Sequence, residues 1–181
     1  MERITLGDRN FEIFLPNEQI VAAIDDVARR INSDYAEVER PLFLGILNGS
    51  FMFMGELMQR IEFPCEVSFV KIGSYSGTDS TGSVRELIGL GGEIRGRHVV
   101  VVEDIVDTGG SIAHIMNALS QRDPASVSIA SLLFKPGKYR EEYEIKYPAL
   151  SIPDDFIVGF GLDYNELGRN LRDIYKVTDG K

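Results

Sequence analysis

The chain of 181 residues is predicted to be an α/β protein whose central sheet is mostly parallel and flanked by helices. Short apolar runs of strand length alternate along the chain with segments whose apolar residues recur at helical spacing. Several runs are apolar at every position, such as "VVVV" at 99–102, and such strands need cover on both faces. In sheets of this kind ligands bind at the carboxyl ends of the strands, so the loops that follow the strands are the expected functional sites.

The first predicted element is a helix over 17–31. Ile20, Ile24, Val27 and Ile31 recur at helical spacing, and Asn17 can cap the first turn. Further helices are expected at 51–60 and 110–121, and strands at 41–47, 65–72, 99–102, 127–134 and 156–160. The loop 73–83 is long, polar and glycine-rich, which is typical of a mobile lid.

Composition narrows the classes of function. The net charge of −9 disfavours a nucleic-acid partner, and the apolar runs are too short to predict a membrane span. The sequence shows no signal peptide, and its single cysteine, Cys65, excludes an internal disulfide, which together predict a cytoplasmic protein. The absence of repeats and linkers predicts one domain over residues 1–181. A small anionic ligand would need backbone N–H groups, local cations or a metal.

The stretch "EDIVDTGGS" at 103–111 carries the clearest chemical signal. The "DTGGS" segment lies between a strand and a helix, where successive N–H groups can cradle a phosphate. Glu103 and Asp104 precede it, and two carboxylates suit the vicinal hydroxyls of a ribose. The stretch therefore reads as a ribose-5-phosphate site, and the alternative is a solvated turn with Asp107 as a helix N-cap.

This stretch resembles the phosphoribosyl-pyrophosphate signature of type I phosphoribosyltransferases, and the whole chain resembles their hypoxanthine-guanine branch. The resemblance is carried, in order, by "ILNGSFMFMGEL", "SYSGTDSTG", "VVVVEDIVDTGGS", "SLLFKPGK" and "DDFIVGFGLDYNELGRNL". It implies the type I phosphoribosyltransferase fold, with a small hood from the N- and C-terminal segments and a mobile lid at about 73–83. It also implies purine salvage: transfer of the 5-phosphoribosyl group from 5-phosphoribosyl 1-pyrophosphate to hypoxanthine or guanine, giving IMP or GMP and pyrophosphate.

The resemblance also implies roles for single residues. Asp107 is the expected catalytic proton acceptor, Lys135 donates to the purine 6-oxo group, and Phe156 stacks on the base. Asn48 stands in the pyrophosphate loop, where the family usually has Lys and a cis peptide bond. The full set is Glu103 and Asp104 for ribose; Asp107, Thr108, Gly109, Gly110 and Ser111 for the 5′-phosphate; Asn48, Gly49 and Arg169 for pyrophosphate; Ser74 and Tyr75 for the lid; and Lys135, Phe156, Ile157 and Asp163 for the purine.

Mg²⁺ is the implied cofactor, with Asp163, Glu103 and Asp104 as its expected ligands; a hard cation of this kind prefers oxygen and keeps waters. The implied partners are the small-molecule substrates and further copies of the chain, as a dimer or tetramer. The sequence leaves open the choice among hypoxanthine, guanine and xanthine.

Two other classes of protein share features with this sequence. A signalling receiver domain also has an acidic pair and a Lys-Pro step, but it has no need of "DTGGS" or of a long lid. A regulator with this fold that binds RNA is disfavoured by the acidic charge.

Overall fold

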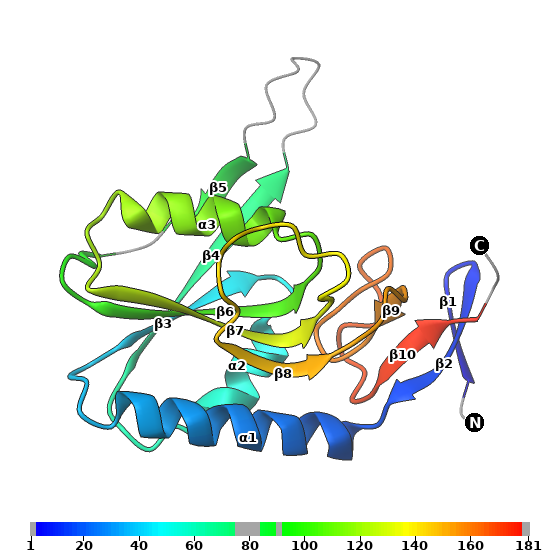
Figure 1. Cartoon of the computed structure of the whole chain (residues 1–181). Helices are drawn as coiled ribbons and strands as arrows, with labels where there is room; N and C mark the ends of the chain where they lie inside the picture. The colour runs from blue at the N-terminus through cyan, green and yellow to red at the C-terminus, as the bar shows by residue number, and fades with distance from the viewer. Residues whose placement is uncertain (1–2, 75–83, 90–91, 179–181) are drawn as a thin grey trace.

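The structure, a computed structural model, describes residues 3–74, 84–89 and 92–178. Two sheets make up its frame, a large one with helices on both faces and a small one to its side (Figure 1). The helices are α1 (Asn17–Tyr35), α2 (Phe51–Met58) and α3 (Gly110–Ser120). None of the helices in the described residues is both long and apolar enough to cross a membrane.

The large sheet has the strand order β5-β4-β3-β6-β7-β8. Its strands are β3 (Leu42–Leu47), β4 (Glu66–Ser74), β5 (Val84–Ile88), β6 (His98–Val106), β7 (Ser126–Phe134) and β8 (Tyr147–Ser151). All neighbouring pairs are parallel except β4 with β5, which is antiparallel. The predicted mostly parallel α/β fold is therefore confirmed. Because parallel strands end at the same edge, the loops after β3, β6 and β7 open on one side of the sheet.

Both faces of this sheet are buried, as the continuous apolar runs require. Along β6, Val99 and Val101 pack with α3, whereas Val100 and Val102 pack on the opposite face with α1 and α2. Figure 1 shows α3 on one face and α1 and α2 on the other. Successive side chains of a strand point to opposite faces, so a strand between two helical layers must be apolar throughout.

The small sheet has the order β1-β2-β10-β9 and is antiparallel. Its strands are β1 (Arg3–Leu6), β2 (Arg9–Leu15), β9 (Ile157–Val158) and β10 (Ile174–Val177), so it joins segments from the two ends of the chain. The strand predicted at 156–160 is therefore shorter and belongs to this second sheet. It ends early because Gly159 and Gly161 have positive φ and begin a turn.

Two further local predictions are corrected. The first helix continues to Tyr35 instead of ending at residue 31. Asn17 does not cap it: Pro16 occupies the N-cap, with no side-chain capping bond. Instead, Asn17 is tied to the other end of the chain, because its backbone N–H donates to Asp173 Oδ1 at 2.7 Å and its side chain donates to the Arg172 carbonyl at 3.0 Å.

Candidate active site

The acidic pair lies within the last part of β6, since this strand extends to Val106 rather than ending at residue 102. Glu103 is 6% exposed. Among the residues that the structure describes, its Oε2 has no hydrogen-bond partner. Asp104 Oδ1 accepts a hydrogen bond from the backbone N–H of Ile105 at 2.9 Å. The pair thus presents acceptor oxygens with few protein donors to satisfy them.

Burial sets the protonation of this pair. It raises the pKa of Glu103 well above its usual range, and the charge of Asp104 raises it further. Burial raises the pKa of Asp104 to about 6, although the Ile105 N–H bond opposes the rise. Two partly uncompensated carboxylates are costly in the free protein, and a ligand that donates hydrogen bonds or positive charge would relieve that cost.

The loop after β6 forms the first cavity, of about 240 Å³, lined by Glu103 and residues 105–112. Gly109 has a φ of +99° and is the N-cap of α3. A Cβ at Gly109 would lie 2.7 Å from the ring of Tyr139, so only glycine fits this turn. The predicted phosphate residues 107–111 all line this cavity, which lies at the start of α3. The first N–H groups of a helix have no partner within the helix and are suited to bind an anion.

The loop after β3 lies directly against the acidic pair. The peptide bond between Leu47 and Asn48 is cis, as the family resemblance implies. A Cβ at Gly49 would overlap Asp104 Oδ2, and a Cβ at Gly161 would overlap the Gly49 carbonyl. Gly49 therefore lies too close to both the Asp104 side chain and Gly161 for either glycine to carry a side chain, and three segments distant in sequence, 47–50, 103–111 and 157–169, meet at this point.

The second cavity, of about 310 Å³, lies between the two sheets and has apolar and charged walls. It is lined by Asp104, Ile105, Asp107, Lys135, Asp155, Phe156, Ile157, Leu162 and Asp163. Phe156 is 44% exposed, which fits a ring that awaits a stacking partner better than a core residue. Its ring packs against Phe11 of β2, at 6.4 Å between ring centroids, and against Tyr164, at 5.8 Å.

Asp163 and Arg169 face each other beside this cavity. An Arg169 guanidinium nitrogen lies 2.6 Å from Asp163 Oδ1, and its other terminal nitrogen donates to the Gly161 carbonyl at 2.9 Å. The backbone N–H of Glu166 donates to Asp163 Oδ2 at 2.8 Å. Both side chains are thus held in place at the turn that contacts Gly49.

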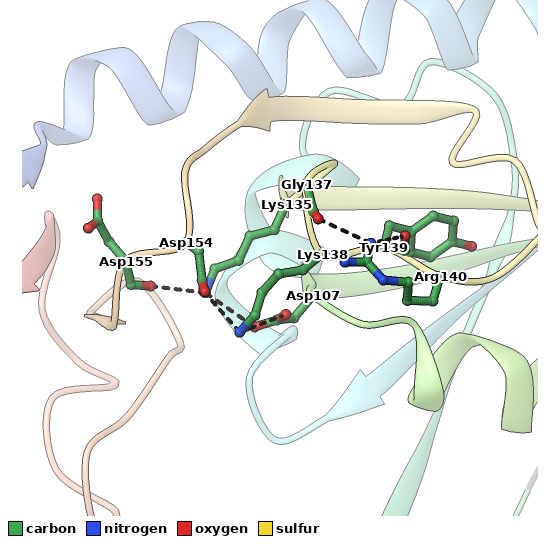
Figure 2. A network of polar contacts seen from close by, with 8 residues as sticks. All are labelled: Asp107, Lys135, Gly137, Lys138, Tyr139, Arg140, Asp154 and Asp155. Carbon is green, nitrogen blue, oxygen red and sulfur yellow. Dashed lines mark hydrogen bonds and ion pairs between the residues drawn. The ribbon is translucent and has the colours of Figure 1, made fainter.

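Lys135 lies at the end of β7, inside a network that the sequence did not reveal (Figure 2). Its ammonium contacts Asp107 Oδ2 and Asp154 Oδ1, both at 3.2 Å, and the Asp155 carbonyl at 2.9 Å. Lys138 reaches the same carboxylates, at 2.9 Å from Asp154 Oδ1 and 3.4 Å from Asp107 Oδ1. The sequence shows the residues of this network, the lysines in "KPGK" and the acids in "PDD", but it does not show that they are close together. The parallel pairing of β7 with β8 brings the two loops together.

The structure therefore gathers most of the predicted site at one edge of the sheet. The residues that line the two cavities or contact a residue that does are Gly49, Glu103, Asp104, residues 107–111, Lys135, Phe156, Ile157, Asp163 and Arg169. Asn48 directly precedes Gly49, at the cis peptide bond. Ser74 ends β4, and Tyr75 and the rest of the predicted lid lie outside the described residues. The chemical roles of all these residues remain predictions.

The donors suit a magnesium ion that is shared with a substrate. Within the described ranges, no group of three or more His, Cys, Asp or Glu side chains could hold a metal ion alone. Glu103 Oε2 has no hydrogen-bond partner among the described residues, and Asp104 and Asp163 add further hard oxygen donors beside it. Mg²⁺ readily takes one or two carboxylates and fills its shell with phosphate oxygens and water, so this site fits it.

Comparison with known proteins agrees with this geometry. Residues 11–165 match the phosphoribosyl transferase domain family. The hypoxanthine phosphoribosyltransferase of Haemophilus influenzae is 36% identical over 170 residues, covering 92% of this chain and 95% of that protein. The hypoxanthine-guanine phosphoribosyltransferase of Staphylococcus epidermidis is 42% identical over 161 residues, with coverages of 88% and 89%.

Solved structures show the same likeness. A ternary substrate complex of the hypoxanthine phosphoribosyltransferase from Trypanosoma cruzi superposes with a TM-score of 0.85 and 36% identity, covering 92% of this chain and 95% of that one. Sequence, fold and the two adjoining cavities thus agree, and the chain belongs to the phosphoribosyltransferase family, in the branch of the hypoxanthine and hypoxanthine-guanine phosphoribosyltransferases.

Proposed function

We propose that this protein transfers the 5-phosphoribosyl group from 5-phosphoribosyl 1-pyrophosphate to hypoxanthine or guanine, giving IMP or GMP and pyrophosphate. The names of its relatives support this activity. The two cavities support it independently, because one has the features of a phosphate site and the other those of a site for a flat, polar base.

The position of Asp107 carries the proposal. This residue lines both cavities. Its Oδ1 is buried and, among the described residues, accepts no hydrogen bond, although the Lys138 ammonium lies 3.4 Å away as an ion-pair partner. A proton acceptor is needed where the base meets the sugar, because the purine loses an N–H proton as its nitrogen attacks C1′ of the ribose. A carboxylate oxygen that accepts no hydrogen bond and lies at the junction of the two cavities suits that task.

The proposed reaction forms the bond between C1′ and the purine nitrogen and breaks the bond between C1′ and the pyrophosphate oxygen. The purine proton passes to Asp107, and the electron pair of the broken bond leaves with pyrophosphate. Positive charge develops on the sugar as in glycoside chemistry. Glu103 and Asp104 accept hydrogen bonds from the ribose hydroxyls and fix the sugar, while residues 107–111 hold the 5′-phosphate.

Residues beside Gly49 and Gly161 would receive the pyrophosphate. The Gly49 N–H and the Arg169 guanidinium donate to its oxygens. Bound Mg²⁺ would neutralise charge on the leaving pyrophosphate. We propose Asp163, Glu103 and Asp104 as its ligands, in part through water. Such an ion also explains how a chain with a net charge of −9 binds an anionic substrate.

We propose that Lys135 selects 6-oxopurines, because an ammonium donates to a carbonyl oxygen and cannot accept from an amino group. Phe156 would stack on the base, and the backbone of Ile157 would meet its edge. We further propose that the chain acts in the cytoplasm as one domain and as a homo-oligomer, with the small sheet as the hood and the segment after Ser74 as the lid.

A steady-state assay tests the proposal. 5-Phosphoribosyl 1-pyrophosphate and Mg²⁺ are supplied with hypoxanthine, guanine, xanthine or adenine, and pyrophosphate release is followed. Turnover with one or more oxopurines and none with adenine supports the proposal. A folded protein that turns over no oxopurine refutes it, and the site would then bind its ribose phosphate for another purpose.

A further inference from the structure

Lys135 has no spare donor in this structure. An ammonium group has three N–H donors. Its three acceptors here are Asp107 Oδ2, Asp154 Oδ1 and the Asp155 carbonyl, at 3.2, 3.2 and 2.9 Å. The side chain is 8% exposed, so water does not supply easy replacements. Any purine oxygen that takes a hydrogen bond from Lys135 must therefore displace one of these acceptors.

The displaced carboxylate needs another cation. Asp107 and Asp154 together carry two negative charges, and leaving a partly buried carboxylate without a partner is costly. Lys138 belongs to the same network (Figure 2) and is the more exposed of the two lysines, at 39% against 8% for Lys135. Its ammonium is 2.9 Å from Asp154 Oδ1, the oxygen that Lys135 also contacts, and 3.4 Å from Asp107 Oδ1.

Two ammonium groups that share one carboxylate oxygen also repel each other. Hydrogen bonds from Lys138, and then from Lys135, lower the pKa of Asp154, so this residue stays ionised and keeps both cations near. The repulsion reduces the cost of turning Lys135 away from Asp154. If Lys138 were absent, Lys135 would be the single counter-ion of two carboxylates and would be held more firmly.

We propose that Lys138 is a positioning residue, which becomes the counter-ion of Asp107 and Asp154 when Lys135 turns toward the 6-oxo group of the incoming purine. This inference rests on the proposed function and assigns a role to a residue outside the predicted site. Lys138 itself touches no substrate in this scheme. Its effect is to keep Lys135 available to the base and Asp107 paired.

The test is a comparison of Lys138→Met, Lys138→Arg and wild type in steady-state kinetics with hypoxanthine and guanine. For the Met variant we expect the purine KM to rise about three- to fivefold, the range of a half-exposed ion pair. The KM for 5-phosphoribosyl 1-pyrophosphate should change by less than about twofold. The Arg variant should restore the purine KM, because it returns a cation to both carboxylates.

Lys146→Met is the matched control. Lys146 is also a half-exposed lysine, at 44% against 39% for Lys138, and it pairs with Asp34 at 2.8 Å. Since this pair lies outside the two cavities, its loss should leave both KM values unchanged. Urea midpoints of all variants check that the Met variants remain folded.

A double-mutant cycle tests whether Lys138 acts through the shared carboxylate. In an Asp154→Asn background Lys135 is already released, so Lys138→Met should raise the purine KM by less than about twofold. An equal rise in both backgrounds, a rise shared by both substrates, or a wild-type purine KM in Lys138→Met overturns the inference. If the wild type turns over no purine, the proposed function itself fails; a wild type that is active beside a Met variant with normal KM refutes this inference alone.

Discussion

Replacing Asp104 with Asn should stabilise the free protein, and the gain should grow with pH. Burial is the main cause that raises the pKa of Asp104 from 3.8 to about 6. At 1.36 kcal/mol per tenfold change, this rise corresponds to about 3 kcal/mol against the ionised form. The side chain retains partial contact with solvent through the cavity that it lines, and screening reduces the cost to about 1–2 kcal/mol.

The sign follows from proton linkage. The folded protein holds a proton on Asp104 over a pH range in which the unfolded chain has released it, so the folded state is favoured at low pH. Stability is therefore lost as the pH rises from about 3.8 through about 6. Asn carries no charge, and its side-chain oxygen can still accept the hydrogen bond from the Ile105 N–H. Removing the Asp104 charge also eases ionisation of Glu103, which acts in the same direction.

The assay is urea unfolding of Asp104→Asn and wild type at pH 5 and pH 8, with EDTA and without substrate. About half of the gain, roughly 0.5–1 kcal/mol, should develop between these two pH values, at unchanged m-value. Asp34→Asn is the control, because hydrogen bonds from Lys146 and Tyr147 lower the pKa of Asp34. The stabilisation that ionised Asp34 contributes is already complete at pH 5. Asp34→Asn should therefore lower the free energy of unfolding by the same amount at pH 5 and at pH 8.

A stability difference for Asp104→Asn that is the same at pH 5 and pH 8, or a variant less stable than wild type at pH 8, would refute the reasoning. The variant should also bind 5-phosphoribosyl 1-pyrophosphate more weakly. Greater stability with weaker binding is the behaviour of a residue kept for function at a cost to the fold.

Three further predictions concern the site. Asp107→Asn should lower kcat by about 10²–10⁴-fold in the steady-state assay, and unchanged turnover would remove it from the proton transfer. Gly161→Ala should destabilise the protein by about 1–3 kcal/mol in urea unfolding, because its φ is +101° and a Cβ would overlap the Gly49 carbonyl; an unchanged midpoint would contradict this. Lys135→Gln should narrow the ratio of kcat/KM between hypoxanthine and adenine by roughly tenfold or more, since an amide can accept as well as donate; an unaltered ratio would show that selection lies elsewhere.

Local patterns in the sequence were sufficient to predict the four central strands of the large sheet, β4, β3, β6 and β7, but not its outer strands β5 and β8. β3 is apolar throughout, and β6 and β7 each contain an unbroken apolar run, because helices cover both faces of the sheet, and that pattern is visible without the fold. The "DTGGS" turn was predicted as a phosphate loop because glycines and hydroxyls between a strand and a helix suit that use, with a solvated turn as the alternative. The expected roles of the site residues outside this loop came from the family resemblance.

The small sheet was not predictable from local patterns. β9 has two residues and β10 has four, and β10 pairs with β2 from the other end of the chain. Asn17 illustrates the same point, because a residue typical of a helix cap instead bonds to Asp173 and Arg172. A short segment has too little pattern of its own, and its pairing depends on where distant parts of the chain are placed.

The sequence by itself determined the acids after the valines and the glycine turn as candidate site residues, and through the family resemblance it added Lys135 of "KPGK" and Phe156 of "DDF". Only the tertiary structure decided the burial, the pKa values and the charge partners of these side chains. In the folded chain Asp107 lines both cavities, and burial raises the pKa of Asp104 to about 6. The pairing of β7 with β8 brings Lys135 and Lys138 to the carboxylates that they share. Burial and charge neighbours depend on which strand ends meet, and that is a property of the packed sheet rather than of any one segment.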